Sequence, residues 1–415
     1  MPTLMRRQRR ALSLLLLVTA VALTACGGGG GDNSVGATPA QSATPAPTAT
    51  STPAPTPTDA DRVAVGDKLF HDQRLSAAGN LACAGCHVQL RGHADAEGGF
   101  LPLGGAGLDQ QGPRSSPSLD YLNDNRPFTI DNQGRPVGGF TWDGRADSRA
   151  AQALGPLLAA NEMANTDNAA VVARVRSLSY FNELGFAFSL SANASDAQVL
   201  LALQQALQAY QIGDPDYATF SSKFDAVQAG SAAFNAQEAR GLAAFNSPQL
   251  GNCASCHPST PQGAQTRALF TNFGYFALGV PRNRSTATAD PAFFDLGLCG
   301  PLRTDLANRT DLCGKFKVPT LRNVALTAPY FHNGALATLG EVVGFYATRD
   351  TDPGRWFPVV GGVVATFNDL PPAYRGNINQ QIPFGLQPGQ APRLSAQQVQ
   401  DIVAFLGTLT DGFKP

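Results

Sequence analysis

A five-residue pattern occurs twice in this chain and constrains its fold more than any other feature. The pattern reads Cys-Ala-Gly-Cys-His from Cys83 to His87 and Cys-Ala-Ser-Cys-His from Cys253 to His257. Two thiols separated by two residues and followed directly by an imidazole form the attachment signature of a c-type haem. The thiols bond to the porphyrin and the imidazole binds the iron. The sequence therefore predicts two covalent haems, held by Cys83, Cys86 and His87 and by Cys253, Cys256 and His257.

Two other readings of the pattern are a redox-active cysteine pair and half of a zinc site. A structural zinc ion takes four nitrogen or sulfur ligands that come in clustered sequence blocks. The two motifs lie far apart in the sequence, and together they use four of the seven cysteines and two of the five histidines. The haem interpretation accounts for the adjacent histidine in both motifs, so we prefer it.

The first 25 residues predict a processed export signal. Basic residues precede an apolar run from Ala11 to Leu23, and thirteen residues are few for a membrane span. Leu23 to Cys26 reads Leu-Thr-Ala-Cys, which is similar to the lipobox of bacterial lipoproteins. An ordinary signal peptidase site is the alternative. The lipoprotein reading places a lipid on Cys26 and the protein in the periplasm, where Gly27 after the cysteine favours the outer membrane.

The segment from residue 26 to residue 59 consists largely of Gly, Ala, Thr, Pro and Ser. Such a composition offers no apolar set to bury, so we expect a disordered tether between the lipid and the folded part. Membrane contact is expected through the lipid anchor only.

The remaining cysteines are Cys299 and Cys313. In an exported and oxidising compartment a disulfide between them is the simplest prediction, and two free thiols are the alternative. The net charge of −1 gives no indication of nucleic-acid binding.

A coarse repeat follows the tether, and each unit reads helix, haem motif, long loops, helix. The first unit opens with a helix ending near Phe70 and closes with a helix over 196–210; the second opens at 236–245 and closes at 395–409. Apolar residues recur at helical spacing in the closing helices. We predict a mainly α fold of two tandem cytochrome c-like domains with long loops, one covalent haem each, over residues 60–230 and 231–415.

Five further motifs carry a resemblance to a known family. They are Phe140–Ala146 (FTWDGRA), Gln152–Pro156 (QALGP), Asn161–Met163 (NEM), Val318–Thr327 (VPTLRNVALT) and Ala328–Gly334 (APYFHNG). In order and spacing the chain resembles the bacterial di-haem cytochrome c peroxidases, a superfamily that includes MauG.

The resemblance implies that Glu162 moves protons at the N-terminal haem, where Gln152 and Pro156 line the pocket. A solvated loop glutamate is the alternative for Glu162. The distal-loop histidine of typical members is absent from residues 100–112. His93 follows His87 by only six residues, so we interpret it as a polar loop histidine. The first haem is then expected to bind peroxide without prior reduction.

For the second haem the resemblance implies that Tyr346 is the second axial ligand, where peroxidases usually have Met and MauG has Tyr. A core aromatic is the alternative. The three methionines are Met1, Met5 and Met163, which leaves no suitable Met ligand. Trp142 matches a tryptophan between the haems that relays electrons, although it could also simply fill the core.

The resemblance also implies a calcium ion bound by the carbonyl oxygens of Thr327 and Pro329. The third family ligand is an Asn, and Ser115 stands in its place here. A hydroxyl oxygen is acceptable to calcium. His71 and His332 are interpreted as structural.

The expected function is reduction of hydrogen peroxide at the N-terminal haem, with electrons from a small cytochrome c or a cupredoxin delivered through the C-terminal haem. The first alternative is MauG-like oxidation of a partner protein's side chains through a high-valent state shared by the two haems. The second is a di-haem electron-transfer cytochrome without catalytic activity.

Overall fold

The computed structural model describes residues 55–95, 101–283 and 292–414. The predicted signal peptide (residues 1–25), Cys26 and the tether as far as residue 54 lie outside the described residues. Within the described part of the chain, no helix combines the length and the apolar character that crossing a membrane requires.

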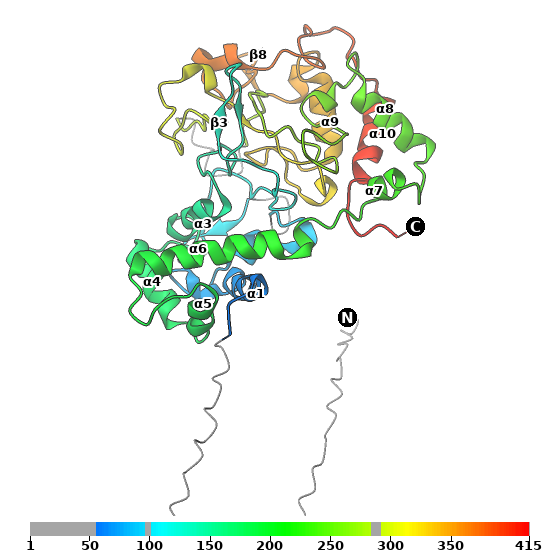
Figure 1. Ribbon diagram of the computed structural model, residues 1–415. Coiled ribbons are helices and arrows are strands. Elements are labelled where there is room, and N and C mark those ends of the chain that lie inside the picture. Colours follow the sequence, from blue (N-terminus) through cyan, green and yellow to red (C-terminus); the bar gives the residue numbers. More distant parts are fainter. Residues whose placement is uncertain (1–54, 96–100, 284–291, 415) are drawn as a thin grey trace, which may run out of the picture. The chain divides into compact units, whose positions relative to one another are not determined.

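Helices α1 (Asp59–Phe70) and α6 (Asp196–Gly213) pack against each other in the N-terminal half (Figure 1). Each begins at a capping box, formed by Thr58 with Asp61 and by Ser195 with Gln198, which satisfies free N–H groups of the first turn. Gly66 lies at their closest approach, where a Cβ atom would stand 2.1 Å from the Ala206 carbonyl oxygen. The two helix backbones can therefore touch only because residue 66 is glycine.

The same arrangement recurs in the C-terminal half. Helix α8 (Ala236–Asn246) packs on α10 (Ala396–Gly407), and a Cβ atom at Gly241 would lie 2.0 Å from the Asp401 carbonyl oxygen. The four predicted helices and the mainly helical, two-unit fold are thus confirmed.

Short elements complete the two halves. The other helices are α2 (Cys83–Cys86), α3 (Arg149–Leu158), α4 (Asn168–Ser177), α5 (Phe181–Ala187), α7 (Lys223–Gln228) and α9 (Leu339–Thr348). The strands of the described residues form four antiparallel pairs: β1 (Leu103–Gly104) with β2 (Gln110–Gln111), β3 (Thr129–Ile130) with β4 (Pro136–Val137), β5 (Tyr275–Phe276) with β6 (Phe316–Lys317), and β7 (Val359–Val360) with β8 (Val363–Val364).

Each half has its own apolar core. The first core draws its buried residues from Val65 to Tyr217, and the second from Phe224 to Leu409. Figure 1 shows α1 and α3–α6 gathered in one region and α7–α10 in another. The boundary between residues 230 and 231 stays a prediction, although Phe224 of α7 already packs in the second core, 5.0 Å from Phe270 between ring centroids.

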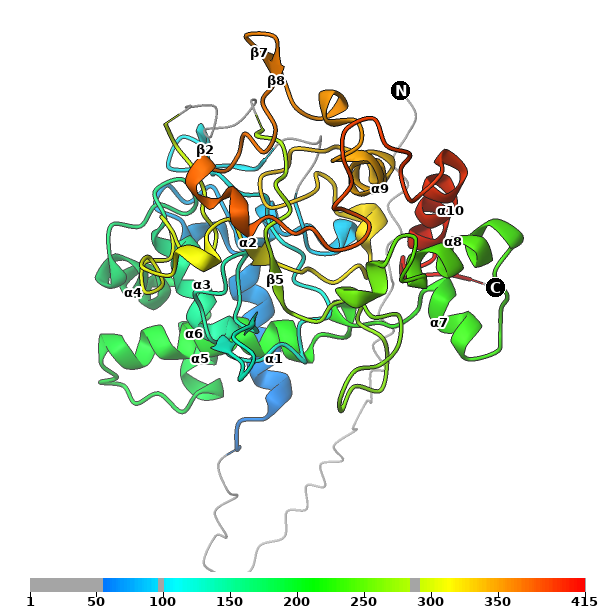
Figure 2. The ribbon, with the colours of Figure 1, turned by 90° about the horizontal axis from the view of Figure 1, so that it is seen from above.

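One segment of the N-terminal half packs against the C-terminal half. Phe128 and Ile130, beside and within β3, contact a small cluster formed by Tyr275, Leu298 and Leu312. The Tyr275 hydroxyl donates a hydrogen bond to the Gly138 carbonyl oxygen over 2.6 Å. Figure 1 labels β3, and Figure 2 labels β5, to which Tyr275 belongs. The contact ties residues 128–138 to the C-terminal half, shortly before Trp142 in the sequence.

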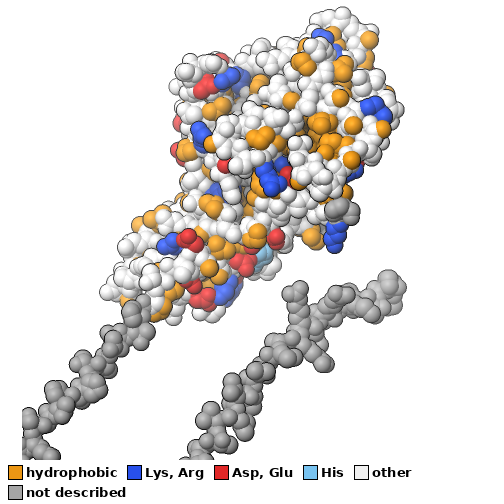
Figure 3. Space-filling view, turned by 45° about the vertical axis from the view of Figure 1, so that its right-hand side comes forward, with side chains coloured by type: hydrophobic (Ala, Val, Ile, Leu, Met, Phe, Trp, Pro, Cys, Tyr) orange, Lys and Arg blue, Asp and Glu red, His pale blue; other side chains and the backbone are white. Residues whose placement is uncertain are grey.

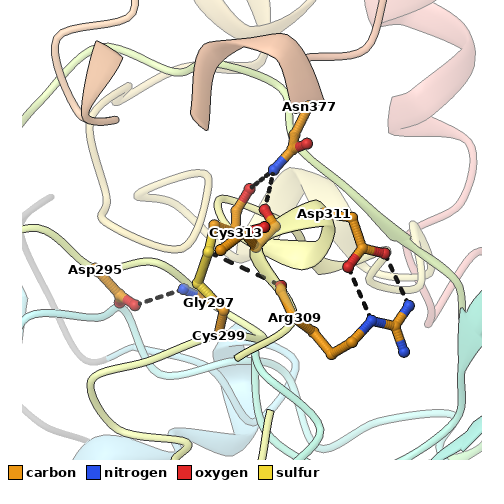
Figure 4. The surroundings of a disulfide bond; sticks show 8 residues. Asp295, Gly297, Cys299, Arg309, Asp311, Cys313 and Asn377 are labelled. Atoms are coloured by element: carbon orange, nitrogen blue, oxygen red, sulfur yellow. Dashed lines mark hydrogen bonds and ion pairs between the residues drawn. A yellow bond between two sulfur atoms is a disulfide. The ribbon is translucent and has the colours of Figure 1, made fainter. Parts of the chain in front are cut away.

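A disulfide joins Cys299 to Cys313, with 4.9 Å between their Cα atoms (Figure 4). The side-chain amide of Asn377 donates to the Cys313 and Thr310 carbonyl oxygens, which ties the bridged loop to a distant segment. On the face drawn in Figure 3, basic and acidic side chains are interspersed. The described residues of that face thus form no broad surface of one charge.

Candidate haem sites

The two motifs present their histidines in the same way. The backbone N–H of His87 donates to the Cys83 carbonyl oxygen over 2.9 Å, and that of His257 to the Cys253 carbonyl oxygen over 2.8 Å. The ring Nδ1 of His87 lies 2.9 Å from the His93 carbonyl oxygen. The ring Nδ1 of His257 lies 2.8 Å from the Phe270 carbonyl oxygen.

These contacts suit both imidazoles for metal ligation. A carbonyl oxygen only accepts, so Nδ1 carries the proton and the Nε2 lone pair is left for a metal. Burial lowers the pKa of His87 and of His257 to about 4. Both rings are therefore neutral at physiological pH, which is the form that binds iron.

A cavity opens beside each motif. The N-terminal cavity is lined by Cys83, Cys86, His87, Trp142, Gln152, Pro156 and Glu162, among others. The C-terminal cavity is lined by Trp142, Cys253, Cys256, His257 and Tyr346, among others. Both linings are mainly apolar. Two thiols, a neutral imidazole and an apolar cleft fit a covalently attached haem in each cavity.

Glu162 faces the N-terminal cavity with its backbone held at both ends. Its N–H donates to the Ala159 carbonyl oxygen, and its own carbonyl accepts from Gly105 over 2.7 Å. The carboxylate makes no hydrogen bond with any described residue. Burial raises its pKa above the ordinary 4.5, and the nearby Arg145 opposes that shift. A carboxyl group in this environment keeps its proton to a higher pH than a free glutamate does, and can act as an acid and as a base.

Helix α3 supplies two more residues of the same cavity, Gln152 and Pro156. A proline has no N–H, so Pro156 cannot donate the usual helical hydrogen bond to the carbonyl four residues earlier, which belongs to Gln152. Ser148 caps the helix through the Ala151 N–H. The first turn of the helix is thus stabilised by its cap, and the helix lacks a backbone hydrogen bond where it lines the cavity.

Tyr346 lies on α9 and lines the C-terminal cavity with His257. Its ring stacks on Phe384 with 5.4 Å between centroids. Tyr346 is half-buried, and no described residue forms a hydrogen bond with its hydroxyl. Burial raises the pKa of this phenol, and a bound ferric ion would favour the opposite, ionised form.

Trp142 contributes to the lining of both cavities. Its indole Nε1 donates to the Ser115 carbonyl oxygen over 2.8 Å, and its carbonyl oxygen accepts from the Lys317 N–H over 2.9 Å. The next residue, Asp143, is fully buried and paired with Arg114 at 2.8 Å. The indole is therefore fixed by one hydrogen bond, and its backbone and the neighbouring residue are fixed by two further contacts.

Sequence reasoning missed the part played by His93. Its carbonyl oxygen orients His87, and its buried ring bonds to Asp120 over 2.7 Å and stacks on Tyr217 with 4.0 Å between centroids. Its backbone φ is +48°, so the carbonyl direction depends on a left-handed turn. Gly92, which is also left-handed, signals a turn here, but it does not indicate that the next carbonyl reaches the ring of His87.

The other two histidines differ from each other. His71 lies on the surface, 2.9 Å from Asp67. His332 stacks on Phe316 with 3.5 Å between centroids and lines the C-terminal cavity. Among the described residues, neither of them lines the N-terminal cavity.

One of the predicted calcium ligands, Ser115, is drawn into a protein contact, and an arginine binds the carbonyl between the other two. The Ser115 hydroxyl donates to the Phe331 carbonyl oxygen over 2.8 Å. Between Thr327 and Pro329, the Ala328 carbonyl oxygen accepts from the Arg91 guanidinium over 2.8 Å. A cation therefore already lies at this loop, and the calcium site stays a prediction.

Comparison with known proteins agrees with this geometry. A family model for di-haem cytochrome c peroxidase matches residues 60–233. The methylamine utilization protein MauG of Paracoccus denitrificans is 34% identical over 354 residues, 84% of this chain and 88% of that protein.

Two further proteins show the same likeness. Cytochrome c551 peroxidase of Nitrosomonas europaea is 29% identical over 68% of this chain and 72% of its own length. The crystal structure of the diheme peroxidase BthA from Burkholderia thailandensis is similar with a TM-score of 0.78 and 37% identity, covering 86% of this chain and 87% of that one. This chain therefore belongs to the di-haem cytochrome c peroxidase and MauG family of enzymes.

Proposed function

We propose that this protein reduces hydrogen peroxide at the haem site of the N-terminal cavity. Electrons would pass between this site and the haem site of the C-terminal cavity through Trp142. The observation that carries the proposal is the position of Trp142, which lines both cavities while Glu162 lines only the first and Tyr346 only the second. A plain electron-transfer cytochrome needs neither a poised carboxyl group nor an open iron face.

Glu162 is the proposed proton shuttle. The haem held by His87 would supply an iron that binds peroxide. Glu162 accepts the proton of the inner peroxide oxygen and returns it to the outer one, so that the outer oxygen leaves as water. Gln152 and Pro156 shape the space around the peroxide and restrict access of bulk water.

Tyr346 is the proposed second ligand at the haem held by His257. A phenolate oxygen is an anionic donor that stabilises oxidised iron, whereas a methionine sulfur raises the reduction potential. The tyrosine therefore favours the second candidate function, oxidation of a partner protein's side chains. Both functions use the Glu162 and Trp142 positions, and they differ in the electron donor.

The remaining parts of the proposal concern location and donor. The export signal and Cys26 support a periplasmic protein with a lipid anchor, at the outer membrane. A small cytochrome c or a cupredoxin would supply electrons in the first function, and a protein substrate would do so in the second. Calcium bound at Ser115, Thr327 and Pro329 is a lesser part of the proposal.

The test is peroxide turnover by purified Glu162→Gln protein, with Glu183→Gln as the control. Glu183 pairs with Lys68 on the surface, away from both cavities. Loss of the shuttle is expected to slow turnover by about 10²–10⁴-fold, and the acid limb of the pH profile should disappear because the raised pKa of Glu162 sets it. Turnover equal to that of the control would contradict the assignment.

A further inference from the structure

Lys317 lies in the wall that the two cavities share. It is the last residue of β6, where its register partner on β5 is Tyr275. Its backbone N–H donates to the carbonyl oxygen of Trp142. The residue lines both the N-terminal and the C-terminal cavity. The residue is therefore part of the wall between the two haem sites.

The immediate partners of the Lys317 ammonium group are neutral. Nζ donates to the Gly138 carbonyl oxygen over 2.8 Å and to Asn125 Oδ1 over 3.2 Å. The rings of Phe273 and Tyr275 each lie 5.3 Å from Nζ and add a weak cation–π attraction. No carboxylate of the described residues forms an ion pair with it.

The other charged groups around the cavities have partners of their own. Arg114 pairs with Asp143 and Asp295, and Arg145 also pairs with Asp143. Asp369 lies 3.3 Å from His332 and 3.6 Å from Arg282. Among the other described residues that line the cavities, two charged groups have no ion pair: Arg149, which donates to Gln211 and Asn123, and the Glu162 carboxylate on the N-terminal side.

The surrounding protein atoms make the ammonium form of Lys317 less stable. Burial lowers the pKa of this amine to about 7. A lowered pKa means that the ammonium form is present below that pH and is lost as the pH rises through it. The charge between the cavities is therefore expected to change within the physiological range.

We propose that Lys317 is a positioning residue for electron exchange, whose positive charge between the two haem sites favours the reduced form of both haems. A nearby cation stabilises an added electron by Coulomb attraction, and the attraction is strong where water is excluded. The lysine itself gains no electron, because the electron resides on the haem iron. This inference deepens the proposed function and rests on it.

The experiment is spectroelectrochemical titration of both haems in the purified holoprotein, from about pH 5 to about pH 9. Four proteins are compared: wild type, Lys317→Met, Lys317→Arg and the control Lys315→Met. Lys315 precedes β6 and does not line either cavity. Haem content by mass confirms that each variant is assembled.

The Met variant should have lower potentials than wild type at acidic pH, and its potentials should lack the lysine-linked pH dependence. The Arg variant stays charged at every pH used, so its potentials should remain high in alkali. Wild type should behave like the Arg variant in acid and like the Met variant in alkali. The Lys315 control should follow wild type.

Potentials in the Met variant equal to wild type in acid, or parallel pH traces in all four proteins, would overturn the inference. If the Met variant fails to retain two haems, the comparison of wild-type and Lys317→Arg potentials at alkaline pH decides the question, because only the wild-type potentials are expected to fall. The titration uses no peroxide, and peroxide turnover is measured separately. A protein that gives the expected potentials but does not turn over peroxide would contradict the proposed function and leave the charge effect standing.

Discussion

The N-terminal and C-terminal cavities orient their motif histidine in the same way but differ in the other residues that line them. In both, a histidine follows a short turn and its Nδ1 bonds to a backbone carbonyl oxygen, that of His93 or that of Phe270. Beyond this the N-terminal cavity contains Glu162 and no second histidine among its described lining residues, whereas the C-terminal cavity contains Tyr346. One motif thus serves two chemistries, and the difference lies in residues far from it in sequence.

The sharpest way to separate the two cavities is to remove one attachment site at a time. Changing Cys83 and Cys86 to Ala should remove the N-terminal haem, and changing Cys253 and Cys256 to Ala should remove the C-terminal one, because each pair bonds one porphyrin. Denatured protein should then carry one covalent haem by mass instead of two. Two retained haems in either variant would contradict the comparison.

The ligand of the C-terminal haem is the next contrast. Replacing Tyr346 by Met should raise the potential of that haem and leave the N-terminal haem nearly unchanged, since thioether ligation favours reduced iron. Tyr330→Phe is a suitable control because its hydroxyl bonds to the Val324 carbonyl oxygen. Equal potentials in wild type and Tyr346→Met would show that Tyr346 is an ordinary core residue.

The disulfide belongs to the C-terminal half and should stabilise that half selectively. Cys299 and Cys313 are fourteen residues apart, and a loop of that size corresponds to about 3 kcal/mol of unfolding free energy. Denaturant unfolding of the double Ala variant, followed by the spectra of the two haems, should show earlier loss of iron ligation at the C-terminal haem, which stays covalently attached. Simultaneous early loss at both sites would mean that the halves unfold as one unit.

The smallest contrast compares the two helix crossings. Gly66→Ala and Gly241→Ala each introduce a Cβ within about 2 Å of a carbonyl oxygen on the neighbouring helix, and such overpacking costs roughly 1–3 kcal/mol. Unfolding midpoints should fall by similar amounts in both variants. Gly230→Ala serves as a comparison without a nearby atom, although its positive φ adds some strain of its own. A large asymmetry would show that one crossing is able to shift apart.

The sequence was most informative where a local pattern has a direct physical meaning. The apolar stripes around Leu203 and Ile402 predicted α6 and α10, and both residues are buried. The haem motifs likewise require only adjacent residues. The glycines at the two helix crossings were not predicted, because glycine alone does not indicate which backbone approaches it.

The candidate sites depend on contacts that no local pattern describes. Lys317 becomes notable only when Asn125, Gly138 and Tyr275 meet it from three separate segments. The carbonyl of His93 orients His87 through a backbone turn rather than through a side chain. Glu162, Trp142 and Tyr346 were reached through the family resemblance, and their places in the two cavities come from the fold.

Electron paramagnetic resonance of the ferric holoprotein, before and after one equivalent of peroxide, tests the central contrast most directly. An open N-terminal site and a tyrosine-ligated C-terminal site predict one high-spin and one low-spin ferric signal. They also predict loss of the high-spin signal on peroxide addition, without prior reduction. Two low-spin signals, with reaction only after reduction, would show that both irons carry six ligands at rest and would contradict the account.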